Sequence, residues 1–151
     1  MKTRYIIILL SFFCTSIVSA QNTLFDKYSN MDDVTIVYIS KSMFNLMPNI
    51  EPEGIDLGAI KNKIESLQIL TSSNETLISK MYDEFNVSTK KEYEELMRIK
   101  DEDTIVNFYM KKEKERVNEF LMLTYSKEEF VAIQLVGNFT IDDIQQLTAN
   151  K

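Results

Sequence analysis

Histidine and tryptophan are absent from this chain of 151 residues, and Cys14 is its one cysteine. Without histidine, the chain cannot build a Ser–His or Cys–His catalytic pair or a zinc site of the Cys/His type. A single cysteine cannot close an intramolecular disulfide, so the fold must rest on its hydrophobic core. Gly54, Gly58 and Gly137 stand apart and form no phosphate-binding loop. We therefore expect no cofactor.

The first twenty residues have the organisation of a secretory signal peptide. Lys2 and Arg4 give a positive start, residues 5–13 read YIIILLSFF, and the small residue Ala20 precedes the polar Gln21. The apolar run is shorter than the roughly 20 residues that a membrane-spanning helix needs. We predict cleavage between Ala20 and Gln21 and export to the periplasm or the outside, with no membrane anchor left on the mature chain.

Cys14 raises the alternative of a lipoprotein. A lipobox has a small residue directly before its cysteine, and in this chain Phe13 stands there. The sequence therefore favours export without a lipid.

Export changes the charge of the chain. Removal of residues 1–20 lowers the number of basic residues from 17 to 15 against 23 acidic ones, which leaves a net charge of −8. Such an excess repels a phosphate backbone, and the basic cluster at residues 111–116 is interrupted by acids. No nucleic-acid partner is expected.

Hydrophobic periodicity predicts the secondary structure of the mature chain. Helices are expected near residues 24–31, 41–47, after Asp56, behind Ser72 and behind Thr140; strands are expected at 34–40, 67–71, 103–110, 117–125 and 130–138, with 93–99 ambiguous. Ser72 and Glu75 have capping-box spacing, and Thr140 is placed to cap the last helix. Residues 34–40 are apolar on both pleat faces, which is typical of a central strand covered on both sides.

This order of elements predicts one α+β domain over residues 21–151. The two early strands are joined by helices and can lie parallel, whereas the late strands, with short polar connections, form an antiparallel meander. We expect a two-layer sandwich with one mixed sheet, packed by helices mainly on one face. The order of the strands stays open.

Two segments, Leu24–Phe44 (LFDKYSNMDDVTIVYISKSMF) and Phe120–Leu147 (FLMLTYSKEEFVAIQLVGNFTIDDIQQL), resemble the domain-of-unknown-function family 4252 of secreted Bacteroidetes proteins. The resemblance covers essentially all of the mature chain. It implies a bacterial envelope protein, in a family whose members are often encoded near extracytoplasmic sigma-factor genes. The family has no established activity, so the resemblance assigns no site residue.

Acid–base chemistry without histidine must use carboxylates, lysine or tyrosine. The acidic clusters all fall at predicted turns or helix caps, where Asp is favoured for backbone hydrogen bonding: 32–33, 101–103, 128–129 and 142–143. No segment has the spacing of an EF-hand loop. We expect no catalytic, cofactor-binding or metal-binding residue.

Two groups of residues are candidates for a partner surface. Met43, Phe44 and Met47 lie on more than one side of a very short helix, so they are either core or part of an exposed patch. Tyr109 and Tyr125 belong to strands that are apolar on both faces. Either helices cover both faces there, or one face carries an apolar patch that a partner covers.

A modification site is suggested by Asp103-Thr104-Ile105. This triplet resembles the acceptor of Bacteroidetes O-glycosylation, with Thr104 as the modified residue.

The sequence therefore favours an exported, non-catalytic binding module for an unknown envelope protein, itself a monomer, linked to envelope stress or surface signalling. Two alternatives stay open. A carboxylate-dependent hydrolase of envelope glycans requires two facing carboxylates in a cleft. A carrier of a small apolar ligand requires a large apolar cavity.

The cleavage prediction is checked by N-terminal sequencing and intact mass of protein recovered from its native host. We expect Gln21 as the first residue, because the segment before it has the small side chains that signal peptidase accepts. Retention of residues 1–20, or a diacylglycerol on Cys14, would contradict it.

Overall fold

The structure, a computed structural model, describes residues 23–47, 57–58 and 60–149. The predicted signal peptide, with Ala20 and Gln21, and the predicted helix start at Asp56 lie outside the described residues. Within the described part of the chain, no helix is both long and apolar enough to cross a membrane.

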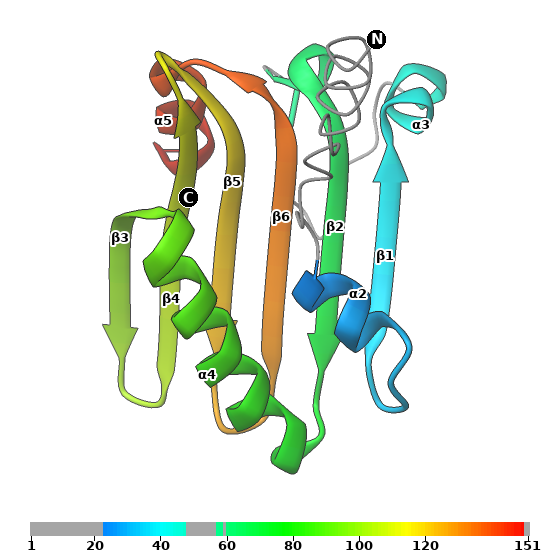
Figure 1. Cartoon of the computed structure of the whole chain (residues 1–151), viewed down its shortest axis with the longest axis vertical. Coiled ribbons are helices and arrows are strands. Elements are labelled where there is room, and N and C mark those ends of the chain that lie inside the picture. Colours follow the sequence, from blue (N-terminus) through cyan, green and yellow to red (C-terminus); the bar gives the residue numbers. More distant parts are fainter. Residues whose placement is uncertain (1–22, 48–56, 59, 150–151) are drawn as a thin grey trace, which may run out of the picture.

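The strands of the described residues form one antiparallel sheet (Figure 1). In chain order they are β1 (Thr35–Ser40), β2 (Ile64–Ser72), β3 (Glu94–Asp101), β4 (Thr104–Glu113), β5 (Arg116–Tyr125) and β6 (Phe130–Phe139). Across the sheet the order is β1-β2-β6-β5-β4-β3, so β1 and β3 are its two edges. The helices are α2 (Thr23–Ser29), α3 (Lys41–Leu46), the 3-10 turn η2 (Lys61–Lys63), α4 (Glu75–Glu92) and α5 (Ile141–Ala149).

The predicted α+β sandwich and the antiparallel meander of the late strands are confirmed, but the sheet is not mixed. β1 and β2 pair antiparallel, with Ser40 at the end of β1 opposite Ser66 near the start of β2. A parallel return needs an element that runs back along the whole strand. The described elements of the connection between β1 and β2 are α3, with six residues, and η2, with three, and neither is long enough to run back along the strand. The chain therefore re-enters the sheet at the end where β1 leaves it.

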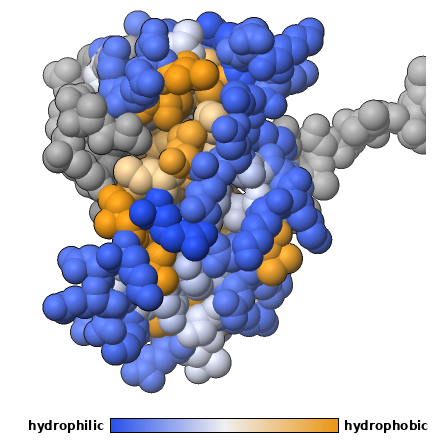
Figure 2. Space-filling model, turned by 90° about the vertical axis from the view of Figure 1, so that its left-hand side faces the viewer, coloured by the Kyte–Doolittle hydropathy of each residue, from blue (hydrophilic) through white to orange (hydrophobic). Residues whose placement is uncertain are grey.

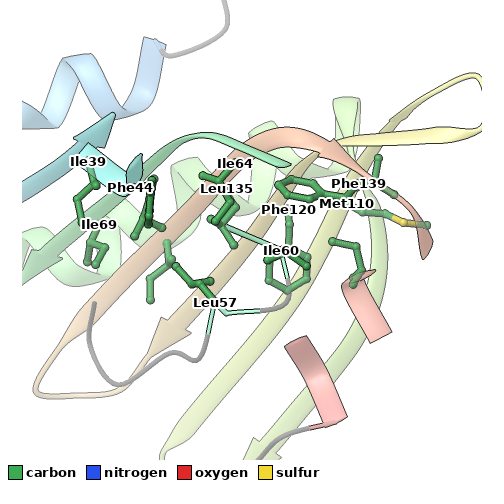
Figure 3. Close-up of a cluster of buried hydrophobic side chains, with 14 of the residues drawn as sticks. Ile39, Phe44, Leu57, Ile60, Ile64, Ile69, Met110, Phe120, Leu135 and Phe139 are labelled. Carbon is green, nitrogen blue, oxygen red and sulfur yellow. The ribbon is translucent and has the colours of Figure 1, made fainter. Parts of the chain in front are cut away.

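Both faces of the sheet are packed, because alternate residues of each strand point to opposite faces. On one face lie α2 and α4, with α4 crossing the sheet diagonally from the β2 side to the β3 side (Figure 1). Their apolar side chains bury Leu70, Tyr109, Leu121, Leu123, Phe130 and Ala132. On the other face, Phe44 of α3, Leu57 and Ile60 belong to a second cluster (Figure 3), to which α5 contributes Ile144.

Helix α4 begins later than the sequence predicts. Asn74, not Ser72, is its N-cap: the side-chain oxygen of Asn74 accepts hydrogen bonds from the backbone N–H groups of Thr76 (3.0 Å) and Leu77 (3.2 Å). Ser72 is the last residue of β2, and its hydroxyl donates to the carbonyl of Asp33 (2.8 Å). The helix then continues past the buried Thr89 to Glu92.

The predicted cap of α5 is confirmed and forms a reciprocal pair of hydrogen bonds. The Thr140 hydroxyl accepts from the backbone N–H of Asp143 (3.2 Å), and the Asp143 carboxylate accepts from the backbone N–H of Thr140 (2.7 Å). Asp143 also accepts from Lys63 (2.7 Å), which ties α5 to η2. Burial acts to raise the pKa of Asp143, but the hydrogen bonds from Lys63 and Thr140 outweigh it and hold the pKa below its usual value.

Asp143→Asn should therefore lower the free energy of unfolding by about 1–2 kcal/mol at pH 7, and by less in acid. A carboxyl with a lowered native pKa stabilises the fold above its unfolded pKa of about 4, and this contribution is lost as the pH falls through the native pKa. Urea unfolding at pH 7 and pH 2 measures the difference. Asp142→Asn, at the exposed neighbour, is the control; an equal loss for Asp143→Asn at both pH values would contradict the assignment.

Candidate functional site

Among the strands that the structure describes, β1 is the exposed one without charged residues, and it lies at an edge of the sheet. The sequence predicted a central, covered strand here, and that prediction is wrong. Ile36, Val37 and Tyr38 are 36%, 39% and 61% exposed, and only Ile39 is buried. An edge strand also presents outward-pointing backbone N–H and C=O groups that pair with nothing in its own sheet. The strand thus offers a row of hydrogen-bonding groups beside apolar side chains.

The position of β1 follows from the way it is anchored. It pairs with β2 over its whole length, from Thr35 opposite Thr71 to Ser40 opposite Ser66. Beyond it, the buried ring of Phe44 lies on the same side of the sheet as Ile39 (Figure 3). One strand partner and one buried helix residue therefore hold the segment in place, and no strand of the described residues pairs with its outer edge.

Helix α3 extends this apolar region. Met43, Leu46 and Met47 are 41%, 78% and 50% exposed. The exposure predicted as one alternative for Met43 and Met47 is thus observed, whereas Phe44, at 4% exposed, belongs to the core. We define the β1–α3 surface as Ile36, Val37, Tyr38, Met43, Leu46 and Met47. The sequence missed Ile36, Val37, Tyr38 and Leu46; the one available sign was an apolar strand without polar alternation, interpreted as burial.

The opposite edge, β3, is protected in the usual way. All of its residues are exposed, and Leu96, Met97 and Ile99 are among them, but they alternate with charges at Glu94, Glu95, Arg98, Lys100 and Asp101. Figure 2 views the molecule from this side and shows hydrophilic residues interleaved with hydrophobic ones. Charges on an edge strand oppose pairing with another strand, because pairing would desolvate them. β1 carries no charge, so the two edges differ in kind.

Charges flank β1 at both ends, with opposite signs. Asp32 and Asp33 are exposed in the turn before the strand, and Asp33 has a positive φ of 64°. Lys41 follows the strand directly and pairs with Glu65 at 2.6 Å, where both side chains are about half exposed. Exposed pairs of this kind contribute little to stability. The strand is thus acidic where it begins and carries an exposed cation where it ends.

The two tyrosines proposed for a partner surface lie beneath α4. Tyr109 is 3% exposed, so its placement on a surface is wrong; its hydroxyl donates to the side-chain oxygen of Asn86 (3.1 Å), and burial raises its pKa. Tyr125 is half-buried, and its ring stacks on Tyr82 with centroids 4.4 Å apart. Of the two readings of these strands, coverage by a helix is the one observed.

One carboxylate is enclosed between the sheet and the end of α4. Glu119 is 2% exposed and accepts hydrogen bonds from the Tyr93 hydroxyl and from the Gln134 amide (2.9 Å). Lys111, on the neighbouring strand, lies 3.7 Å from Glu119 and 3.1 Å from Glu92. Burial and the hydrogen bond to Glu119 raise the pKa of Tyr93. The Glu119 carboxylate thus has hydrogen-bond donors and a cation within its own fold. We assign it the role of holding the end of α4 against the sheet.

The acidic clusters lie at turns and caps, as the sequence predicted. Residues 32–33 precede β1, 101–103 comprise the end of β3 and the β3–β4 turn, 128–129 lie between β5 and β6, and 142–143 lie in the first turn of α5. Among the described residues, no group of three acidic, cysteine or histidine side chains is placed to hold a metal ion. Thr104 begins β4 beside the β3–β4 turn and is half-buried, next to Asp103, which pairs with Lys127 at 2.8 Å. Its modification stays a prediction.

Comparison with known proteins identifies the family but no activity. No curated protein and no solved structure matches the chain. The family model described as a domain of unknown function, DUF4252, matches residues 28–147, which include every strand and α4. The chain therefore belongs to the DUF4252 family.

Proposed function

We propose that this chain is an exported, non-catalytic binding module of the bacterial envelope and that the β1–α3 surface holds its partner. The observation that carries this proposal is the uncharged edge strand β1 with Ile36, Val37 and Tyr38 exposed. Long apolar edges invite pairing with other strands, and soluble proteins normally protect them with charges, as β3 does. An edge left unprotected is explained by a partner that covers it.

The mode of binding follows from the chemistry of this edge. Strand addition lets a partner form main-chain hydrogen bonds with the outward groups of β1, while alternate side chains contact apolar residues on either face. Met43 and Met47 add flexible side chains that adapt to the shape of a partner. Binding of this kind needs no histidine, thiol or metal, which fits the residue types that the chain contains.

The compartment is part of the same proposal. Residues 1–20 have the pattern of a signal peptide. The resemblance of Leu24–Phe44 and Phe120–Leu147 to secreted Bacteroidetes proteins, which are often encoded near extracytoplasmic sigma-factor genes, supports the same compartment. We place the partner in the envelope, in a role connected with envelope stress or surface signalling.

Site-specific photo-crosslinking tests the proposed surface. Benzoylphenylalanine replaces Tyr38 in one variant and Leu96 on β3 in the matched control; both positions are exposed and apolar on edge strands. In cells or envelope extract of the producing bacterium, the probe at position 38 should give a defined crosslinked product, and the probe at position 96 should not. Mass spectrometry identifies the product.

Equal crosslinking at both positions, or no product at position 38, would refute the proposed surface. Circular dichroism of both variants checks that the fold is intact. Since Tyr38 is 61% exposed, we expect no change in the melting temperature.

A further inference from the structure

We propose that the partner of β1 is a second copy of this chain, and that two β1 strands pair antiparallel across a two-fold axis at Val37. This inference rests on the proposed function, because it names the partner of the same surface. It replaces the monomer expected from the sequence with a symmetric dimer. Two six-stranded sheets would join into one continuous sheet.

Symmetry fixes the register. A two-fold axis that pairs two antiparallel strands runs perpendicular to the sheet, so opposite residues point to the same face and one residue faces its own copy. With Val37 on the axis, Ile36 lies opposite Tyr38 of the second copy, and Thr35 lies opposite Ile39. Every strand residue from 35 to 39 then has a partner.

The cross-strand pairs of this register are favourable on both faces. On one face, Ile36 of each copy lies opposite Tyr38 of the other. These two pairs of an aromatic and a β-branched residue are of a kind that stabilises sheets. On the other face the pair is Val37 with Val37. The three side chains that are exposed at this edge, 36%, 39% and 61%, are those that the pairing covers.

The charges at the ends of β1 favour the same register. Just beyond the paired residues, Lys41 at the start of α3 of one copy comes near Asp33 and Asp32, in the turn before β1 of the other. Symmetry makes this contact twice. The opposite charges meet only when the two strands run antiparallel, because a parallel arrangement would bring the two acidic ends together. Two copies with a net negative charge can therefore approach at this edge.

The dimer also accounts for the composition of β1. An uncharged strand that is apolar on both faces is the pattern of a central strand. In the single chain β1 is an edge, but in the dimer it lies in the middle of the joined sheet. By contrast, β3 carries the charges expected of an edge that stays an edge.

A disulfide across the axis tests the register. In the full chain carrying Cys14→Ser, Val37→Cys provides the only thiol, and its copy lies directly opposite in the proposed dimer. Under mild oxidation we expect a disulfide-linked dimer in high yield. Tyr38→Cys, whose opposite residue is Ile36, and Leu96→Cys on β3 are the matched controls and should give little dimer. Equal yields at all three positions, or no dimer with Val37→Cys, would overturn the proposal.

Analytical ultracentrifugation of the protein without introduced cysteines tests the equilibrium. We expect a reversible monomer–dimer equilibrium, and Val37→Lys should abolish it, because two ammonium groups would then face each other on the axis. Circular dichroism confirms that this variant folds. A protein that stays monomeric up to its highest soluble concentration overturns the dimer but leaves the photo-crosslinking test, and with it the proposed function, intact.

Charge reversal separates this dimer from other dimers. Lys41→Glu and Asp33→Lys should each weaken association about tenfold, since each disturbs two symmetry-related contacts. The double variant should recover most of the loss. Glu65→Gln, which removes only the contact of Lys41 within its own chain, is the control and should not weaken the dimer. Failure of the double variant to recover would argue for another interface.

Discussion

The antiparallel pairing of β2 with β6 is the contact on which the architecture depends. It joins the β1–β2 pair to the meander β3–β6 and brings Leu67, Ile69 and Leu70 opposite Leu135, Ile133 and Ala132, all of them buried. In the resulting order, β2 and β6 each have a strand on both sides, whereas β1 pairs with β2 alone and β3 with β4 alone. The same pairing places β2 and β3 in one sheet, which α4 crosses as it covers one face. The β2–β6 contact therefore decides that β1 and the meander lie at opposite ends of the sheet.

The two edge strands, β3 and β1, differ in the charges that they carry. β3 is exposed throughout, yet its charges pair within the edge, as Arg98 does with Glu95 (2.7 Å), or with β4, as Glu94 does with Lys112 (3.0 Å). β1 has comparable exposure in its middle and no charge. Both edges belong to the same sheet, so general requirements of solubility do not explain the difference. The proposed use of β1 as a binding edge accounts for it.

Local patterns predicted most elements, whereas the errors arose where distant contacts decide. The late strands were found within a few residues of their ends because short polar turns separate them, and the α5 cap was found because Thr140 and Asp143 form it alone. The spacing between Ser72 and Glu75 favours Ser72 as the cap of α4, but pairing with Phe130 of β6 keeps Ser72 in β2, so Asn74 is the cap. At the candidate site, the exposure of Met43 and Met47 was one of two predicted alternatives, and that of Ile36, Val37 and Tyr38 was missed. Nothing within residues 34–40 reveals that the sheet ends there.

The error at β1 is informative, because the rule that failed is a physical one. A strand without charge on either face is stable in the middle of a sheet, where its backbone is paired on both sides and its side chains are covered. Natural sequences agree with their surroundings at most positions, and the exceptions concentrate at functional sites. The sequence of β1 suits a central strand, whereas within one chain β1 is an edge strand. This mismatch disappears when a second strand is added along the open edge. The proposed second β1 satisfies this requirement with the same residues, and the acidic residues before the strand together with Lys41 after it favour the antiparallel direction.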